Sequence, residues 1–546
     1  MPHIHSLVIK NFRGIRDFEQ HFKSDFICLI GRGDSGKSTI LDAIAMVLST
    51  NWSTQFFDND FHNCDISTPI VIEATITDLP DGLIEEEKFG MYLRGIDATG
   101  KITEEIEEAE KSAITIRLEV HKDLEPQWNV ITEREIGIKK ISANDRSKLN
   151  AFLVADYAER HFSWTKGSPL YSLLKQESDE EENDDAMINA LREAKTKIDA
   201  SEFNKFDSVI AKVKASAAQF GIDISKVKTT IDFRDIVIKD GKVGLHDQLI
   251  PFRLKGKGSK RIISMSIQAS IAEVGGIVLI DEIEQGLEAD RVQNLIHILK
   301  EHNHGQIFIT THSRDVLVEV EAKDIYIARK TSKELFNLSP AIQGSVRRNP
   351  EAFFAKKVLI GEGATELGVC RALNNYRVKK GLPNATFRGV RTADGGGDAM
   401  IEYAQGFLNA GFPTALFCDS DAPIPHSKKP SLRIAGVKIF DWPDTDSFEM
   451  AIFKYLPFPL ILEVFELAAL IKNEEDHTST VDQYKTNMWA SVTSSFGSGC
   501  PGNLAGATDT EPLRLAIAKA STKKDKEWFK RQDKALKTRQ YHIRTL

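Results

Sequence analysis

Eight residues near the N-terminus have the types and spacing needed to hold the phosphates of a nucleotide. Residues 31–38 read GRGDSGKS and fit the pattern GxxxxGK[ST], between an apolar segment, FICLI, and a helical pattern. Glycines in such a loop let backbone N–H groups surround phosphate oxygens, and the helix N-terminus adds positive potential. We expect Lys37 to reach the β and γ phosphates and Ser38 to bind Mg²⁺. The predicted ATP ligands are Gly31, Gly33, Asp34, Ser35, Gly36, Lys37, Ser38 and Thr39.

Two acidic residues follow an apolar segment near the middle of the chain. Residues 277–282 read IVLIDE, which predicts a buried strand with Asp281 and Glu282 at its carboxyl end, where open α/β sheets bind their ligands. We expect Asp281 to complete the Mg²⁺ shell and Glu282 to polarise the attacking water as a general base. The alternative is an exposed acidic pair without a function. A second apolar segment, IFITTH, ends at His312 and favours the functional interpretation.

Together the three motifs resemble the Walker A motif, the Walker B motif and the histidine switch of ABC-type ATPases, which implies a catalytic role for His312. Residues 284–288, EQGLE, resemble the D-loop of the same ATPases. Residues 257–261, KGSKR, stand in the position of the ABC signature but depart from its common LSGGQ pattern. A serine at a helix N-terminus, here Ser259, is still suited to bind a phosphate of a second subunit. The resemblance therefore implies a homodimer that closes on ATP.

Four further carboxylates follow two apolar segments in the last third of the chain. Residues 357–366, KVLIGEGATE, predict a strand with Glu362 at its end and a helix with Glu366 in its first turn. Residues 416–421, LFCDSD, predict a second strand that ends in Asp419 and Asp421, two residues apart and therefore on one side of an extended segment. Hard oxygen ligands of this kind suit Mg²⁺ or Mn²⁺. The pattern predicts a site for one or two such ions.

A glutamate after one strand and DxD after a later strand resemble the Toprim domain of topoisomerases, primases and OLD (overcoming lysogenization defect) nucleases, and the glycine-rich ADGGGD segment between them strengthens the resemblance. OLD nucleases, a family similar to the Gabija-type defence nucleases, join such a domain to an ABC-type head. The resemblance implies metal-dependent cleavage of DNA. It makes Glu362 and Asp419 the principal metal ligands. The supporting acids are then Glu366, Asp421, Asp394 and Glu449.

The OLD family also uses a lysine from its C-terminal part. Here Lys526 or Lys530, in KKDKEWFKR, is the candidate to neutralise the phosphate during cleavage; a solvated charged helix is the alternative. Residues 513–546 hold eleven Lys or Arg against three acidic residues, although the whole chain has a net charge of −8. This basic segment is either a phosphate-binding edge or an exposed helical face.

The remaining pattern predicts an α/β protein of several domains. The expected units are the N-terminal lobe of the ATPase head (1–143), a helical insertion used for dimerisation (144–220), the C-terminal lobe of the head (221–345) and a Toprim domain with a basic end (350–546). Strands are expected at 69–77, 113–119 and 129–138, and a hairpin with its turn at Asp240 and Gly241. The insertion includes an acidic stretch, QESDEEENDD.

Composition excludes several classes of protein. With 41% hydrophobic and 27% charged residues the chain has an ordinary globular composition, and no run of about 18 apolar residues suggests a membrane span. The start lacks the apolar core of a signal peptide, so a cytoplasmic protein without membrane partners is expected. Five scattered cysteines without CxxC spacing are expected to be reduced and structural.

The sequence thus predicts an ATP-hydrolysing, metal-dependent DNA endonuclease. Nicking and double-strand cleavage both remain open. The OLD resemblance further implies a role in defence against phage, in some members with a helicase or other partner protein. A topoisomerase would need a nucleophilic tyrosine in a DNA-gripping domain, and a primase would not need the ATPase head. The non-enzymatic alternative is a clamp like RecF or SMC proteins, which closes around DNA on ATP without cutting it.

Overall fold

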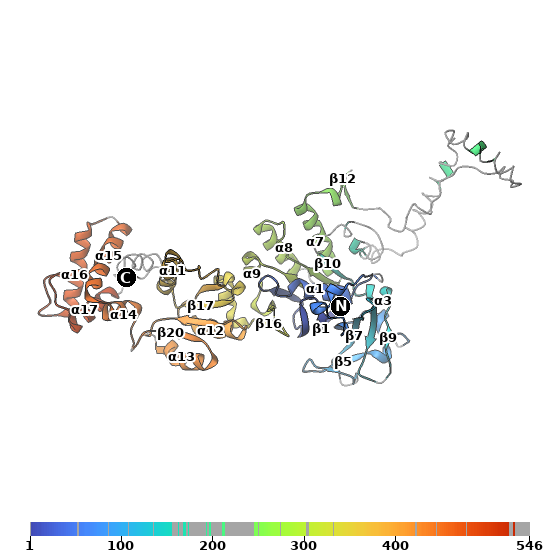
Figure 1. Ribbon diagram of the computed structural model, residues 1–546, viewed down its shortest axis with the longest axis horizontal. Coiled ribbons are helices and arrows are strands. Elements are labelled where there is room, and N and C mark those ends of the chain that lie inside the picture. The colour runs from blue at the N-terminus through green and yellow to red at the C-terminus, as the bar shows by residue number, and fades with distance from the viewer. Residues whose placement is uncertain are drawn as a thin grey trace.

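A computed structural model describes most of the chain outside residues 155–244. It covers residues 2–154 except 52, 53, 86, 107, 108 and 135; residues 162, 168–170, 173, 193, 196, 197, 210–212 and 214; residues 245–523 except 249, 274, 302–304, 331, 421, 422, 444 and 477; and residues 528 and 529. The acidic stretch, the turn expected at Asp240, and Asp421, Lys526 and Lys530 lie outside these residues. Figure 1 shows the described parts arranged in a row, with the N-terminal sheets at one end and the C-terminal helices at the other.

The N-terminal lobe is built on an eight-stranded antiparallel sheet. Its central order is β2-β1-β4-β7-β5-β6, and β8 and β9 extend it from β7. The strands are β1 (His3–Phe12), β2 (Ile15–His21), β4 (Ile70–Thr77), β5 (Arg94–Ile96), β6 (Ile102–Thr103), β7 (Lys111–Val120), β8 (Pro126–Ile131) and β9 (Lys139–Lys140). Two of the predicted strands agree with β4 and β7. The strand expected at 129–138 is wrong after Ile131, because the backbone bends at residues 133, 134 and 136 and Gly137 then adopts a positive φ of 85°.

A six-stranded sheet lies beside the first, in the order β10-β13-β14-β3-β15-β16. All pairs are parallel except the last. The strands are β3 (Phe26–Ile30), β10 (Ala151–Val154), β13 (Ile277–Ile280), β14 (Gln306–Thr310), β15 (Ile325–Ile327) and β16 (Phe336–Asn337). The helices of this region are α1 (Lys37–Val47), α7 (Lys257–Glu273), α8 (Ala289–Glu301), α9 (Arg314–Glu319) and α10 (Gln343–Arg348), with the short α2 (Asp81–Ile84) and α3 (Ala143–Ser147). A small hairpin joins β11 (His246–Asp247) to β12 (Ile250–Pro251).

The expected start of the helical insertion needs a correction. Residues 151–154 form β10, which pairs in parallel with β13 from Ala151 with Ile277 to Val154 with Ile280. This strand belongs to the six-stranded sheet, because its backbone completes the hydrogen bonding at the edge of β13. Most of the remaining residues of the expected insertion, up to 220, lie outside the described part of the chain.

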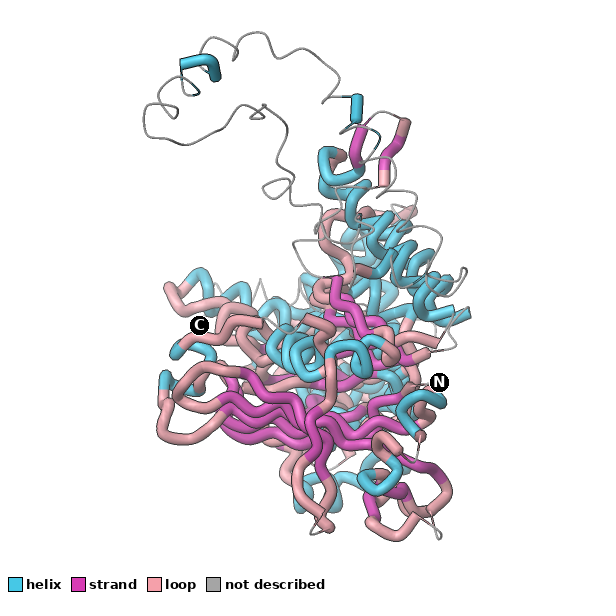
Figure 2. The backbone as a smooth tube through the Cα atoms, turned by 90° about the vertical axis from the view of Figure 1, so that its right-hand side faces the viewer, coloured by secondary structure: helices cyan, strands magenta, loops and turns pink. Residues whose placement is uncertain are grey.

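Strand β3 joins two hydrophobic cores. All five residues of β3 are buried; Ile27 and Leu29 face the core shared with the antiparallel sheet, whereas Phe26, Cys28 and Ile30 face the other core. A strand covered on both faces must be apolar throughout, which explains the uninterrupted run FICLI. Figure 2 shows the strands gathered as a layer with helices around it.

A third, four-stranded parallel sheet follows a connecting segment that ends in the 3₁₀ turn Pro350–Phe354. Its order is β18-β17-β19-β20, from β17 (Lys357–Gly361), β18 (Val390–Asp394), β19 (Thr414–Phe417) and β20 (Lys438–Phe440). Helices α11 (Ala364–Lys379), α12 (Met400–Asn409) and α13 (Pro423–Ala435) alternate with the strands. Phe353, Phe407 and Phe412 pack together in a core that continues into that of the six-stranded sheet. The two parallel sheets are therefore joined by packed side chains.

Four helices form the C-terminal part that the structure describes. They are α14 (Phe448–Tyr455), α15 (Phe458–Asp476), α16 (Val481–Phe496) and α17 (Glu511–Ser521). Their core includes Phe453, Phe465 and the ring of Trp528, which is almost fully buried. Among the described residues, no helix is both long enough and apolar enough to cross a membrane.

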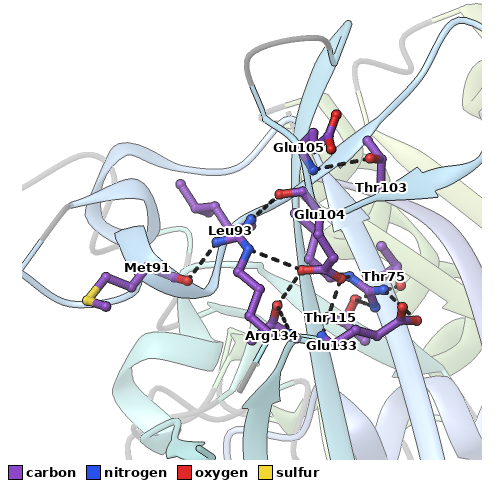
Figure 3. Close-up of polar contacts among 11 residues, drawn as sticks. Thr75, Met91, Leu93, Thr103, Glu104, Glu105, Thr115, Glu133 and Arg134 are labelled. Carbon is purple, nitrogen blue, oxygen red and sulfur yellow. Dashed lines mark hydrogen bonds and ion pairs between the residues drawn. The ribbon is translucent and has the colours of Figure 1, made fainter. Parts of the chain in front are cut away.

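One ion-pair network stabilises the edge of the antiparallel sheet (Figure 3). The Arg94 guanidinium is 2.6 Å from the Glu104 carboxylate and 3.1 Å from that of Glu133, with only 9% of its side chain exposed. Arg134 also reaches Glu104, at 3.5 Å, and donates to the carbonyl oxygens of Met91 and Leu93 at 2.9 Å. Arg94 and Arg134 thus hold Glu104 between the sheet and the loop that contains Met91 and Leu93.

Replacing Arg94 tests this network. We expect Arg94→Met to lower the free energy of unfolding of the N-terminal lobe by roughly 2 kcal/mol, less than for a fully buried pair because Arg134 still accompanies Glu104. The control is Lys111→Met, which breaks an exposed pair with Asp78 and should cost roughly 0.5 kcal/mol. Urea unfolding followed by circular dichroism measures both variants, and equal losses would contradict the interpretation.

Candidate functional site

The loop before α1 has the backbone of a phosphate cradle. Gly31 has a φ of 155°, and a Cβ there would lie 2.5 Å from the carbonyl oxygen of Ala328 and 2.6 Å from Ser35 Oγ. Gly36, the residue before α1, has a φ of 92°. Both positions require glycine, because a side chain would clash at the first and strain the backbone at the second. The loop is therefore closely turned around its own centre.

Lys37 and Ser35 point polar groups into this loop. The Lys37 ammonium donates to the carbonyl oxygens of Gly31 at 3.1 Å and Arg32 at 3.2 Å. Burial lowers the pKa of Lys37, and the negative charges of Asp281 and Glu282 oppose that effect. The hydroxyl of Ser35 is buried without a hydrogen-bond partner among the described residues. Phosphate oxygens would satisfy both groups, so the loop fits a nucleotide.

Two hydroxyl groups meet the carboxylate of Asp281 at the end of β13. Ser38 Oγ donates to Asp281 Oδ1 at 3.1 Å, and Thr310 Oγ1 donates to the same oxygen at 2.5 Å. Parallel strands bring their carboxyl ends to one edge, so residues 243 positions apart come together. A carboxylate beside a serine hydroxyl is a suitable donor pair for Mg²⁺.

Glu282 is held in a strained conformation next to this pair. Its φ is +46°, which is uncommon for a residue with a side chain. Its N–H donates to Thr310 Oγ1 at 2.7 Å, and its carbonyl oxygen accepts from Arg261 Nη2 at 3.1 Å. Arg261, on α7, also donates to the carbonyl oxygen of Asp281. These bonds from two elements keep the backbone in the strained region and thereby fix the direction of the carboxylate.

His312 follows β14 and is positioned by Glu284. The His312 N–H donates to Glu284 Oε1 at 2.7 Å, and the hydroxyl of Thr311 donates to Oε2 at 2.7 Å. Burial lowers the pKa of His312, and the nearby charge of Lys37 lowers it further. Its ring centroid lies 6.3 Å from that of Phe354, beside the third sheet. The imidazole therefore lies between the loop and the connecting segment.

The signature-like and D-loop-like segments are in contact. Helix α7 begins at Lys257, which places Ser259 in its first turn with an exposed side chain. A Cβ on Gly258 would lie 3.0 Å from the carbonyl oxygen of Gly286. The signature-like and D-loop-like segments thus lie side by side, with Ser259 exposed to solvent.

A cavity of about 650 Å³ adjoins the loop; its lining includes Phe18, Asp34, Thr39, Arg329 and Lys333. This volume is ordinary for a small-ligand site, and its place beside Asp34 and Thr39 suits the base and sugar of a nucleotide. A larger cavity of about 1050 Å³ is lined by His3, His5 and His21. It lies at the amino ends of the parallel strands, away from the edge where such sheets bind ligands, and contains none of the predicted site residues.

Two substitutions separate nucleotide binding from hydrolysis. We expect Lys37→Ala to weaken ATP binding at least tenfold, because it removes a buried cation from the loop. Glu282→Gln should keep ATP bound and slow hydrolysis at least a hundredfold, since it removes only the charge that polarises water. Fluorescent-nucleotide titration and phosphate release measure the two effects. Equal loss of binding in both variants would refute these roles.

The second candidate site begins at the carboxyl ends of β17 and β19. Glu362 follows β17, and its Oε2 accepts a hydrogen bond from the N–H of Asp419 at 2.8 Å. Asp419 follows β19, and its Oδ1 accepts from the N–H of Phe448 at 2.9 Å. The two principal carboxylates of the sequence prediction are therefore joined through one backbone group.

Glu366 lies in the first turn of α11, close to two more carboxylates. Its Oε2 accepts from the N–H of Gly363 at 2.9 Å, and the residue is 4% exposed. Burial raises the pKa of Glu366 to about 7; backbone N–H groups oppose this rise, and the charges of Glu362 and Glu449 add to it. The negative charges of Glu362 and Glu449 thus disfavour a negative charge on Glu366.

Asp394 ends β18 and is clamped by the connecting segment. The side chain of Asn349 accepts from the N–H of Asp394 at 2.8 Å and donates to its carbonyl oxygen at 2.9 Å. Arg348 Nη1 lies 4.0 Å from Asp394 Oδ1, with half of its side chain exposed. Gly396 has a φ of 66°, and a Cβ there would lie 2.1 Å from Arg348. The absence of a side chain at Gly396 therefore leaves room for the guanidinium of Arg348 beside the carboxylate of Asp394.

The described residues bring the carboxylates to one edge without completing a metal site. Among them, no three His, Cys, Asp or Glu side chains lie close enough together to hold one ion. Hard carboxylate donors fit Mg²⁺ or Mn²⁺ in kind. The predicted ligand Asp421 and both candidate lysines, Lys526 and Lys530, lie outside the described part of the chain.

Sequence reasoning missed several polar residues at these sites. Arg261 and Thr310 hold the acids after β13, Asn349 and Arg348 hold or flank Asp394, and Lys429 contacts Asp419. The basic, proline-terminated segment SVRRNP was the only signal for Arg348. No local pattern distinguishes the others, because each acts across a long sequence separation.

Comparisons with known proteins identify the N-terminal part. A family model described as "AAA domain, putative AbiEii toxin, Type IV TA system" matches residues 26–319, more than half of the chain. No curated protein sequence matches this chain.

Three solved structures share distant similarity. An SMC head domain from Thermotoga maritima is 16% identical and covers 62% of this chain and 99% of its own, with a TM-score of 0.28. An Smc head bound to the C-terminal domain of ScpA, from Pyrococcus furiosus, is 14% identical (62% and 97% covered, TM-score 0.34). The recombination mediator protein RecF with ATP is 12% identical (62% and 99% covered, TM-score 0.33).

Proposed function

The chain belongs to this AAA-domain family, and from that premise we propose that it is an ATP-hydrolysing DNA endonuclease whose third sheet carries a metal-dependent, Toprim-like cleavage site. The observation that supports cleavage most directly is that an acid stands at the carboxyl end of each of three adjacent parallel strands. Glu362 and Asp419 follow β17 and β19, and Asp394 is the last residue of β18. A clamp that only encloses DNA has no use for such a group of carboxylates.

In the ATP site, this chain's residues bind and orient the nucleotide. Lys37 and the backbone of the loop hold the phosphates, while Ser38 and Asp281 would hold the Mg²⁺ that neutralises their charge. Glu282, with its direction fixed by Thr310 and Arg261, accepts a proton from the attacking water. His312, which follows β14 and is held by Glu284, would contact the terminal phosphate.

In the cleavage site, a bound Mg²⁺ or Mn²⁺ would supply the activated water and stabilise the leaving oxygen. Glu362 and Asp419 are the proposed principal ligands, with Glu366, Asp394 and Glu449 beside them and Asp421 following in the chain. The half-exposed guanidinium of Arg348, near Asp394, is proposed to contact the phosphate backbone of DNA. The basic residues of the 513–546 segment would add nonspecific affinity for DNA.

The biological role belongs to the same proposal. The resemblance to OLD nucleases supports defence against phage, with a helicase or another protein as a partner in some members. The description of the matched family adds the role of a toxin in a type IV toxin–antitoxin system. Cleavage of DNA is a chemistry that would serve either role.

The decisive experiment replaces Asp419 and Glu362 with alanine, singly and together. Cleavage of supercoiled plasmid in Mg²⁺ or Mn²⁺ should fall to background in each variant, because a dication loses a ligand. The double variant should add little, since the two residues act as one unit. ATPase activity should survive, because its own ligands, Ser38 on α1 and Asp281 after β13, lie at the edge of the six-stranded sheet.

The control for these variants is Glu402→Ala, which removes an exposed carboxylate of α12 outside the site and should leave cleavage unchanged. Plasmid cutting by Asp419→Ala at the wild-type rate would exclude the cleavage site. The ATP-dependent clamp would then become the preferred function.

We further expect at least a homodimer in solution, using the signature-like segment around Ser259 and part of residues 144–220. Light scattering with and without ATP measures the mass. Lys37→Ala should reduce any ATP-induced association, since a nucleotide must be bound to bridge two subunits. A monomer under both conditions would contradict the proposal.

A further inference from the structure

A lysine next to the proposed cleavage site is almost completely buried. Lys429, on α13, is 1% exposed. Its ammonium donates to the carbonyl oxygen of Asp419 at 2.7 Å and lies 3.4 Å from Asp441 Oδ2. An ammonium is expensive to remove from water and is retained in an interior only with partners such as these.

The position of Lys429 on α13 selects it from its neighbours. Lys428, one residue earlier, has an exposed side chain. One residue along an α-helix rotates the side-chain direction by roughly 100°, so only one of two adjacent lysines can face the sheet. The pair therefore provides a buried lysine and a chemically identical control.

Three polar groups of Asp419 form hydrogen bonds within this part of the fold. Its N–H donates to Glu362 Oε2 at 2.8 Å, and its carboxylate accepts from the N–H of Phe448 at 2.9 Å. The carbonyl oxygen accepts from Lys429. Since β19 ends at Phe417, this carbonyl lies beyond the strand, and the lysine takes the place of a neighbouring strand's backbone donor.

Asp441 anchors the lysine from the other side. It follows β20, and its carboxylate also accepts two hydrogen bonds from Arg433 Nη2, at 2.9 and 3.0 Å. Arg433 is about half exposed and does not share the contact with Asp419. Lys429 thus connects the carboxylate after β20 to the backbone after β19.

We propose that Lys429 is a positioning residue for the metal-binding acids: by holding the Asp419 carbonyl, it keeps the carboxylates of Asp419 and Glu362 at one edge. This inference rests on the proposed cleavage function. Lys429 would act on the cation indirectly, through its hydrogen bond to the carbonyl oxygen of Asp419. Its loss should therefore weaken cation binding rather than remove the chemistry.

The test measures Mn²⁺ binding by the full chain without nucleotide. All variants carry Asp281→Asn, which disables the ATP-site ion, and free Mn²⁺ is followed by electron paramagnetic resonance. Lys429→Met should weaken Mn²⁺ affinity 10- to 100-fold, the range for groups that orient metal ligands. Lys428→Met should bind as the parent does. Lys429→Arg, which keeps a charged donor, should recover part of the affinity.

Cleavage kinetics with Asp281 intact give a second readout. The Mn²⁺ concentration for half-maximal cleavage should rise in Lys429→Met, whereas the rate at saturating Mn²⁺ should approach that of the wild type. A general loss of structure would instead lower the rate at every Mn²⁺ concentration and reduce the ATPase activity. Asp441→Asn removes the anchor but keeps Lys429, and should weaken Mn²⁺ binding with the fold intact, which maintains the test if Lys429→Met fails to fold.

The possible results are distinct. A folded Lys429→Met protein with unchanged Mn²⁺ affinity overturns the inference, as does equal weakening by Lys428→Met. If Lys429→Met does not fold and Asp441→Asn binds Mn²⁺ as the parent does, the inference also fails. If the Asp281→Asn parent does not bind Mn²⁺ and the wild-type chain does not cut DNA, the proposed function is refuted, and the inference falls with it.

Discussion

The carboxyl ends of parallel strands meet at one edge of a sheet, and both candidate sites depend on this constraint. In the six-stranded sheet it brings Ser38, Asp281 and Thr310 within hydrogen-bonding distance although the chain between them is long. In the four-stranded sheet it brings Glu362 to the backbone of Asp419. Helices placed between the strands then supply the remaining polar groups: Arg261 on α7 beside the six-stranded sheet and Lys429 on α13 beside the four-stranded sheet.

Local pattern was sufficient for the parts of the sites that one strand and one turn define. Sequence pattern alone predicted the loop at residues 31–38 and the acids after β13, β17 and β19. In each case polar residues directly follow the apolar run of a buried strand. Strand β10 was missed because its four residues, AFLV, are too short to show a period and precede a charged region. Lys429 was missed because the sequence does not show whether a lysine is buried or exposed. Its burial becomes evident only in the structure, where it pairs with Asp441 at the end of the next strand.

The connecting segment from α10 to Phe354 touches both sites. His312 packs near Phe354 at one end, and Asn349 clamps the backbone of Asp394 at the other. Between them Glu351 pairs with Arg314 of α9, at 3.2 Å, and with Arg391 of β18, at 3.6 Å. The shared core that includes Phe353 lies beneath. Apolar packing and these ion pairs and hydrogen bonds thus connect the two parallel sheets. Both kinds of contact oppose a displacement of one sheet relative to the other.

The place of β3 in its sheet sets the order in which the chain can fold during synthesis. Its two neighbours, β14 and β15, lie about 280 and 300 residues later, whereas the antiparallel sheet is complete by Lys140. At the usual rate of translation, β3 waits roughly 15 to 60 s for its partners. During that interval the antiparallel sheet can cover Ile27 and Leu29, but Phe26, Cys28 and Ile30 have no cover. The newly made N-terminal half therefore presents an apolar ribbon to the ribosome surface and to chaperones until β14 emerges.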